Sequence, residues 1–225
     1  MNTHKTAARI VGVLFIIGTA AGILSVVFGT SILDDADYLV KISENENQMV
    51  LGAFSVLVMG LALAMIPAVM FPIFRKYNET LAVGYVVFRG ALEAVAYILI
   101  VLSWLLLITV SQEYVKAGTP DASHFQTWGA VLQEAGEWID PILGLVFCLG
   151  ALMFYYLWFK SRLIPRWLSG WGLIGAVISL TAALINMFGP SVEYLEFPLA
   201  VNEMVLALWL IIKGFNSSAI ASEPA

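Results

Sequence analysis

Long apolar runs separated by short polar links make up most of this chain. A helix that crosses the hydrocarbon core of a bilayer needs about 20 mostly apolar residues, and lipid offers no hydrogen bonds to a backbone that leaves its own groups unpaired. Each run that approaches this length therefore predicts one membrane-spanning helix. The six expected spans cover about residues 10–33, 50–74, 81–110, 130–159, 167–188 and 197–212.

These spans predict an all-α fold. We expect a polytopic transmembrane bundle that forms a single domain over residues 1–214, followed by a disordered tail at 215–225. Of the 225 residues, 60% are hydrophobic and only 12% are charged, whereas about a quarter are charged in a typical soluble domain. One soluble core could not hide so much apolar surface, but lipid can cover it. The bilayer is therefore the first expected partner.

Several classes of function lack their sequence signals. The net charge is −5 and no basic stripe occurs, which argues against nucleic-acid binding. The chain contains no ATP-binding loop and no dinucleotide fingerprint, so we expect no cofactor. Cys148 is the single cysteine and the two histidines lie far apart in sequence, so we expect neither an intramolecular disulfide nor a metal site. Assembly into homo-oligomers or hetero-oligomers stays open.

Basic residues are concentrated in every second link between the expected spans. The basic tails and links contain Lys5, Arg9, Arg75, Lys76, Lys160, Arg162, Arg166 and Lys213. The alternate links contain only Lys41 and Lys116, together with most of the acidic residues. Lysine and arginine in short loops mark the cytoplasmic side of a membrane. The pattern therefore predicts that the N- and C-termini are both cytoplasmic.

Three stretches carry a resemblance to a known family. The first is FPIFRKYNE at residues 71–79, followed by Gly84-Tyr85, Phe88-Arg89 and Glu93. The second is SRLIPRWLS at residues 161–169 with Trp171-Gly172, and the third comprises Pro198, Glu203, Ala207, Trp209-Leu210 and residues 213–215. Together they resemble a family of small bacterial six-span membrane proteins catalogued as a domain of unknown function. The resemblance implies the six-span topology and a bacterial plasma (inner) membrane, and it implies no catalytic roles.

Arg89 and Glu93 are ionisable residues deep within the third expected span. They lie four residues apart, so they share one face of the helix. A charge near the bilayer centre costs at least about 2.5–3.5 kcal/mol, and such residues usually face the bundle interior or a wet cavity. Two interpretations follow. The residues form either a structural ion pair that fixes helix packing, or a pair that binds a ligand or carries protons.

Further polar residues map to the outer halves of the later spans. They are Glu137 and Asp140 in the fourth span, Asn186 in the fifth, and Asn202 and Glu203 in the last. We therefore hypothesise an acidic, water-accessible cavity that opens to the outside and is closed below by Arg89 and Glu93. Burial and clustering favour protonation of carboxylates, and ionised carboxylates attract positive charge. Such a site could take protons, small cations or an amine-bearing ligand.

The leading functional interpretation is a non-enzymatic role, the binding or transport of a small cation, a proton-coupled solute or an amphiphile. Glu93 and Glu203 are the expected binding groups, and we expect Arg89 to position Glu93. Two alternatives stay open. One is a structural or regulatory partner of another membrane protein. The other is a membrane-embedded lipid-modifying enzyme that uses Glu93 or Asp140 as general acid or base.

Overall fold

The computed structural model describes residues 3–118 and 122–221, and these residues form helices and no strands, as predicted. The elements in chain order are α1 (Thr3–Ser25), η1 (Val26–Thr30), α2 (Ser31–Leu33), α3 (Tyr38–Glu44), α4 (Glu46–Phe74), α5 (Glu79–Tyr85), η2 (Val86–Leu92), α6 (Glu93–Ala117), α7 (Ser123–Ser161), α8 (Arg166–Phe188), η3 (Glu193–Glu196), α9 (Phe197–Ile212) and α10 (Ser217–Ala221). The segments η1 and η2 are π-helical, and η3 is a 3₁₀-helix.

Within the described residues, six helical segments are long and apolar enough to cross a membrane, which confirms the predicted number of spans. They are His4–Leu33, Glu46–Phe74, Glu79–Ala117, Ser123–Ser161, Arg166–Phe188 and Tyr194–Ile212. The third segment joins α5, η2 and α6 into 39 residues, and α7 also has 39 residues. At about 1.5 Å per residue each is nearly 60 Å long, so both extend well beyond a hydrocarbon core of about 30 Å.

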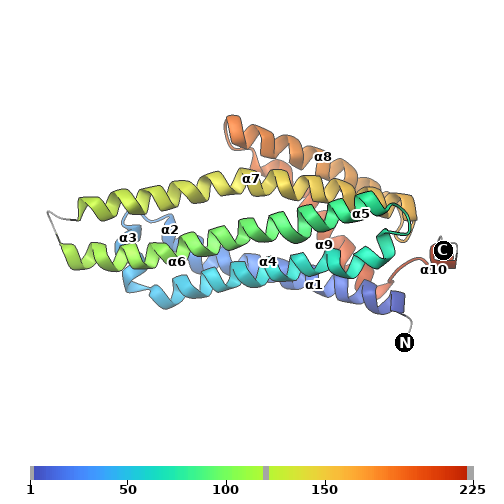
Figure 1. Cartoon of the computed structure of the whole chain (residues 1–225), viewed down its shortest axis with the longest axis horizontal. Coiled ribbons are helices and arrows are strands. Elements are labelled where there is room, and N and C mark those ends of the chain that lie inside the picture. Colours follow the sequence, from blue (N-terminus) through green and yellow to red (C-terminus); the bar gives the residue numbers. More distant parts are fainter. Residues whose placement is uncertain (1–2, 119–121, 222–225) are drawn as a thin grey trace.

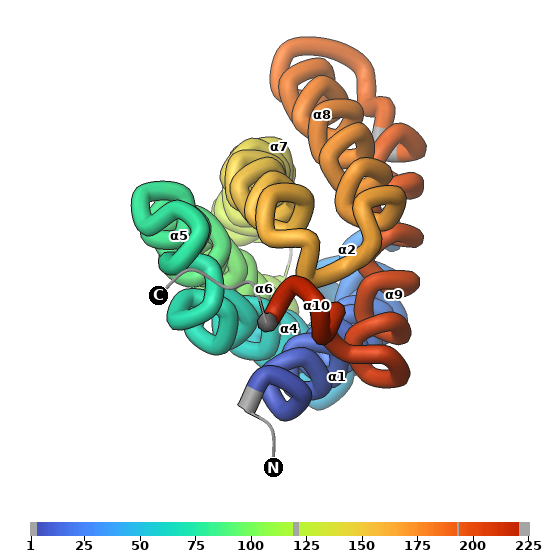
Figure 2. The backbone as a smooth tube through the Cα atoms, turned by 90° about the vertical axis from the view of Figure 1, so that its right-hand side faces the viewer, coloured from blue at the N-terminus to red at the C-terminus, as the bar shows by residue number. Residues whose placement is uncertain are grey.

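The start of α1 and the short helix α10 lie at the same end of the bundle (Figure 1). We call this the terminal end, and we call the opposite end, where α2, α3, the end of α6 and the start of α7 lie, the distal end. Helices α6 and α7 reach furthest toward the distal end, whereas the α8–α9 hairpin stops well short of them (Figure 1). Figure 2 views the bundle from the terminal end and shows α8 leaning away from α5 and α6. Helix α1 packs against α4 and α9, and α7 packs against α6 and α8.

Buried aromatic side chains fill the terminal half of the bundle. Phe154 lies at their centre and stacks on Tyr85 with 4.9 Å between the ring centroids. The ring of Phe154 also contacts four further rings, with centroid distances from 5.2 to 6.1 Å. Aromatic pairs of this kind contribute about 0.5–1.5 kcal/mol each beyond the burial of their surface. We call this cluster the aromatic floor, and it consists of Phe15, Phe74, Tyr85, Phe154, Tyr155 and Trp158.

Close helix contacts and side-chain hydrogen bonds hold the distal end together. Gly29 packs against the indole of Trp104, and a Cβ atom added to this glycine would lie 2.0 Å from the ring. The Ser103 hydroxyl donates to the carbonyl oxygen of Leu132 on α7 at 2.9 Å. The Ser111 hydroxyl donates to a backbone carbonyl of α3. These contacts fix η1, α3 and α7 against α6.

Residues 215–221, which follow α9, are ordered in the structure, whereas the sequence predicted a disordered tail there. Phe215 is buried, with its ring centroid 5.5 Å from that of Trp158. The Asn216 amide donates to the Leu163 carbonyl at 2.8 Å, and α10 follows. The side chains of Phe215 and Ala219 pack into the hydrophobic core at the terminal end, and this packing orders residues 215–221. Residues 222–225 of the predicted tail lie outside the described residues.

Candidate functional site

A π-helical turn places Arg89 inside the bundle. Over Val86–Leu92, η2 interrupts the regular α-helix between α5 and α6. Such turns frequently occur at functional sites. Gly150 of α7 packs on this turn, since a Cβ atom added there would lie 3.4 Å from Arg89 Cβ. The missing side chain at Gly150 therefore lets α7 approach the backbone that carries Arg89.

Arg89 forms ion pairs with two carboxylates. Its Nη1 lies 3.2 Å from Glu93 Oε1, and its Nη2 lies 3.4 Å from Glu203 Oε1. The side chains of Arg89 and Glu93 are only 3% and 1% exposed, whereas that of Glu203 is 18% exposed. The guanidinium carbon lies 4.7 Å from the centroid of the Phe147 ring, which adds a cation–π contact. We call Arg89, Glu93 and Glu203 the charged triad, which has one negative charge in excess when all three groups are ionised.

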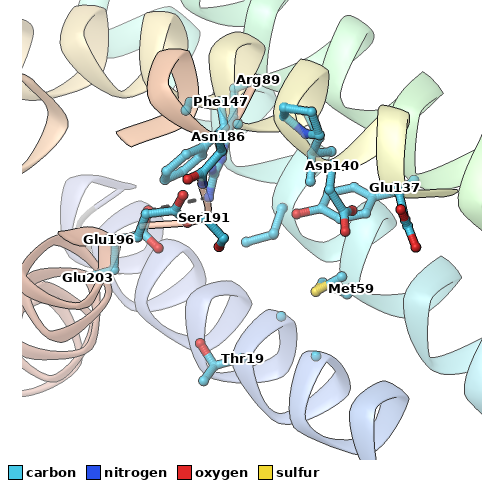
Figure 3. Close-up of a pocket in the computed structure, with 18 residues that line it drawn as sticks. Thr19, Met59, Arg89, Glu137, Asp140, Phe147, Asn186, Ser191, Glu196 and Glu203 are labelled. Carbon is cyan, nitrogen blue, oxygen red and sulfur yellow. Dashed lines mark hydrogen bonds and ion pairs between the residues drawn. The ribbon is translucent and has the colours of Figure 1, made fainter. Parts of the chain in front are cut away.

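The charged triad borders a cavity of ≈ 730 Å³ to which all six spans contribute side chains or backbone. Figure 3 shows Glu137 and Asp140 of α7 on one side of this space, and Glu196 and Glu203 on the other. Exposure increases away from the buried Arg89. Glu203 is partly exposed, and Glu137, Asp140 and Glu196 are exposed. The cavity therefore opens on the distal side of the charged triad.

Apolar groups form a further part of the cavity lining. Gly18 and Gly22 of α1 lie in the lining, as do Leu63 and Met59 of α4, which pack against them. A Cβ atom added at Gly18 would lie 2.8 Å from Leu63 Cδ2, and one added at Gly22 would lie 3.0 Å from Met59 Sδ. The two glycines therefore leave the side chains of α4 accessible from the cavity. Phe147, above the guanidinium, belongs to the same apolar surface.

Five of the seven predicted site residues line this cavity. They are Arg89, Glu137, Asp140, Asn186 and Glu203. Asn186 also supports the wall, because its Oδ1 accepts a hydrogen bond from the Val192 amide at 2.7 Å. This bond holds the loop after α8 in place beside Ser191, another lining residue.

The two remaining predicted residues lie outside the cavity lining. Glu93 sits behind Arg89, with its carboxylate between the guanidinium and the side chain of Tyr97. Asn202 is fully buried, and its Nδ2 donates to the Leu168 carbonyl of α8 at 3.1 Å. Consecutive residues of an α-helix point about 100° apart, so Glu203 can face the cavity while Asn202 faces α8. Asn202 therefore joins two helices and does not border the site.

Four polar lining residues were not predicted from the sequence. They are Thr19, Tyr97, Ser191 and Glu196. For two of them, the spacing in the sequence could have indicated their place in the site. Tyr97 follows Glu93 by one helical turn, and its side chain lies beside the Glu93 carboxylate. Glu196 precedes Glu203 by two helical turns, but it was assigned to an external link, and η3 folds that link back over the cavity.

Acidic groups dominate the charged triad and the lining together. Five carboxylates face the single guanidinium of Arg89, which gives a formal charge of −4. A concave site with low-dielectric walls concentrates ions of the opposite sign. The arrangement therefore attracts positively charged groups and repels anions. In residues 3–118 and 122–221, no group of three or more His, Cys, Asp or Glu is placed to hold a metal ion.

The aromatic floor lies on the terminal side of the charged triad. Tyr85 precedes Arg89 by one turn, and Phe154 follows Gly150 by one turn on α7. Both rings are buried, and Trp158 continues the packing toward the terminal end. The cavity is thus separated from the terminal end by packed aromatic side chains.

Comparisons with known proteins give one kind of match. No curated protein and no solved structure matches the chain. The model of a family described as "Domain of unknown function (DUF4386)" matches residues 10–214, which include nearly all of the six spans. This match confirms the family resemblance that the sequence motifs indicated. The chain therefore belongs to the DUF4386 family of multi-pass helical membrane proteins.

Proposed function

We propose that this protein binds a positively charged ligand in the cavity beside the charged triad, as a membrane-embedded binding protein or carrier without enzymatic chemistry. The observation that supports this proposal is the imbalance of charge among the spans. The one guanidinium at the cavity already pairs with Glu93 and Glu203. Asp140, Glu137 and Glu196 bring three further carboxylates to the cavity, and Arg89 is the basic residue among the lining residues. A lining with this excess of acidic side chains favours a ligand that carries positive charge.

We also propose that the terminal end faces the cytoplasm and that the membrane is a bacterial plasma membrane. The basic residues at the start of α1, between α4 and α5, around the link from α7 to α8 and after α9 all lie at the terminal end of the bundle. The link between α1 and α4 carries Lys41, and α6 carries Lys116 near the distal end. This asymmetry is typical of cytoplasmic loops on the basic side. In this orientation the cavity opens toward the cell exterior.

A structural role is the second candidate, and the charged triad favours it. Arg89 joins η2 to α9 across 114 residues of sequence, so the triad could serve helix packing alone. The two roles differ in what they require of the cavity rim. A purely structural triad makes no demand on Asp140 and Glu196, which are exposed and belong to other elements. Substitutions at the rim therefore separate the two functions.

The test compares choline with its neutral isostere 3,3-dimethylbutan-1-ol, using the full chain in lipid nanodiscs. We expect choline to raise the midpoint of thermal unfolding and to bind by calorimetry, and we expect the isostere to do neither. Asp140→Asn and Glu196→Gln should each weaken choline binding about tenfold, which corresponds to about 1.4 kcal/mol. Glu113→Gln is the matched control, because Glu113 is an exposed acid that pairs with Lys116 near the distal end.

Two results would contradict the cationic-ligand function. The first is equal behaviour of choline and its isostere at every concentration. The second is that Asp140→Asn and Glu196→Gln bind choline as strongly as the control variant Glu113→Gln does. Either result would leave the structural role as the better explanation of the charged triad.

A further inference from the structure

We propose that the ligand is an amphiphile with a cationic head, and that it enters the cavity sideways from the membrane over the tip of the α8–α9 hairpin. This inference rests on the cationic-ligand function proposed above and names the class of ligand. The head lies among Asp140, Glu196 and Glu203, and the hydrocarbon chain lies along the apolar lining. Three observations carry the inference: the size of the cavity, the division of its lining, and the short α8–α9 hairpin.

The cavity is too large for a small cation alone. Its volume of ≈ 730 Å³ falls among pockets that hold drug-sized ligands, about 300–1,000 Å³. A water molecule takes about 30 Å³ in the liquid, so the space equals roughly two dozen waters. A metal ion or a choline-sized head would leave most of it unfilled. A hydrocarbon chain attached to the head would use the remaining volume.

The lining is divided into a charged part and an apolar part. The acids come from α7, η3 and α9, whereas Met59 and Leu63 come from α4 and lie behind the two glycines of α1. Leu143 and Phe147 of α7 extend this apolar part. Each methylene group that moves from water onto such a surface strengthens binding by about fourfold. Apolar side chains beside clustered carboxylates suit a ligand that is itself divided into a charged head and an apolar chain.

The α8–α9 hairpin is short, and exposed residues of the cavity lining lie at its tip. Asn186, Ser191 and Glu196 at its tip line the cavity, so the hairpin ends at the level of the site. Helix α1 packs against α4 and α9, and α7 packs against α6 and α8, so this hairpin lies between α1 and α7. Beyond its tip α1 and α7 continue toward the distal end (Figure 1). The hairpin therefore ends where Asp140 and Glu196 of the lining are exposed, and it does not extend along the distal parts of α6 and α7.

Exposed aromatic side chains lie at the tip of the α8–α9 hairpin. Phe188, Tyr194 and Phe197 are 84%, 74% and 70% exposed; Phe188 ends α8, Tyr194 lies in η3 and Phe197 begins α9. Tyrosine, like tryptophan, is enriched where membrane proteins meet the interface between lipid and water, and Tyr194 lies between the two exposed phenylalanines. The rim of the cavity therefore lies at the depth of lipid headgroups, where the head of an amphiphile resides before it binds.

The test uses dodecyltrimethylammonium with a photoreactive diazirine near the end of its chain, and the full chain in lipid nanodiscs. We expect cross-links in the peptides that contain Met59 and Leu63 and in those that contain Leu143 and Phe147. Unlabelled dodecyltrimethylammonium should compete at least tenfold more effectively than choline. Dodecyldimethylamine oxide at pH 8, which has the same chain but no net charge, should compete poorly. Asp140→Asn should reduce these cross-links, and Glu113→Gln should not.

Each contrary result has its own meaning. Cross-links confined to the outer faces of the helices, with no competition, would overturn the amphiphile inference. Choline that competes as well as the amphiphile would also overturn it, while the cationic-ligand function would stand. If dodecyldimethylamine oxide competed as well as dodecyltrimethylammonium, binding would not depend on the positive charge, and both proposals would fail. If Asp140→Asn impairs folding, the competition series with the unmodified chain still decides between these results.

Discussion

Replacement of Arg89 by glutamine tests whether the buried charges hold the bundle together. The substitution leaves Glu93, which is 1% exposed, and Glu203 without their common partner. At an effective dielectric constant of about 20, unit charges about 3.3 Å apart interact by about 5 kcal/mol. Removal of one member of a buried ion pair costs about 3–5 kcal/mol, because the remaining charge is buried without compensation. We therefore expect Arg89→Gln to lower the free energy of unfolding by about 3–5 kcal/mol.

The ion pair between Lys116 and Glu113 supplies the matched control. Its N–O distance of 2.8 Å is shorter than either distance in the charged triad, but its side chains are 67% and 48% exposed. An exposed pair contributes about 0–1 kcal/mol, so Lys116→Gln should have little effect. In a soluble domain of this size 1 kcal/mol corresponds to about 2–4 °C in unfolding midpoint. On that scale Arg89→Gln should lower the midpoint by about 6–20 °C, and Lys116→Gln by no more than about 4 °C.

The assay is thermal unfolding of the purified full chain in a mild detergent. Neutralising all three members, with Arg89→Gln, Glu93→Gln and Glu203→Gln combined, should restore much of the lost stability, because no buried charge then lacks a partner. The reasoning would be refuted if Arg89→Gln lowered the midpoint no more than Lys116→Gln does. It would also be refuted if the triple substitution were less stable than Arg89→Gln alone.

Three further predictions concern packing and the loop at the cavity. Gly172→Ala should destabilise the protein by about 1–3 kcal/mol, because its Cβ atom would lie 2.1 Å from the Tyr155 ring, whereas nothing lies within 4 Å of a Cβ atom at Gly170. Equal unfolding midpoints for Gly172→Ala and Gly170→Ala would contradict this. Phe154→Ala should cost about 3–5 kcal/mol, since it removes the centre of the aromatic floor, while the exposed Phe197→Ala should change the unfolding midpoint little. Asn186→Ala removes the acceptor of the Val192 amide and should speed proteolysis of the loop at residues 189–192 without a large change in midpoint, and an unchanged cleavage rate would speak against that role.

The number and order of the spans could be predicted because lipid requires long, self-paired apolar helices. The third and fourth spans were predicted too short at their distal ends: the third was ended at 110 although its helix runs to Ala117, and the fourth was begun at 130 although its helix begins at Ser123. Polar residues such as Gln112 and Glu113 ended the apolar run there, but a helix that leaves the membrane can continue in water. The π-helical turns at η1 and η2 leave no mark on hydropathy. The packing of Phe215 depends on Trp158, and so it needed the tertiary structure.

For the candidate site, the sequence predicted how deep each residue lies in the membrane. It did not predict which way each residue faces. Alternation of the spans placed the polar residues of the last three spans in the same half, and five of the seven site residues indeed line one cavity. The spacing of Arg89 and Glu93 predicted their contact. The pairing of Arg89 with Glu203 depends on how α6 and α9 are rotated about their axes, which the sequence of one chain does not specify. The same uncertainty in rotation explains why Asn202 and Glu203 could not be told apart.

The measurement that tests this account most directly is labelling of a cysteine at the cavity rim from each side of the membrane. Cys148 is the single native cysteine and is buried, so Cys148→Ala removes the background. Asp140→Cys in that chain adds one thiol at the rim, and Ala176→Cys, at a fully buried position of α8, is the control. A membrane-impermeant maleimide should label the rim thiol in intact cells but not in inside-out vesicles, and it should label the control in neither. Labelling of the rim thiol only in inside-out vesicles, or no labelling in a folded protein, would contradict an acidic cavity that opens on the distal side.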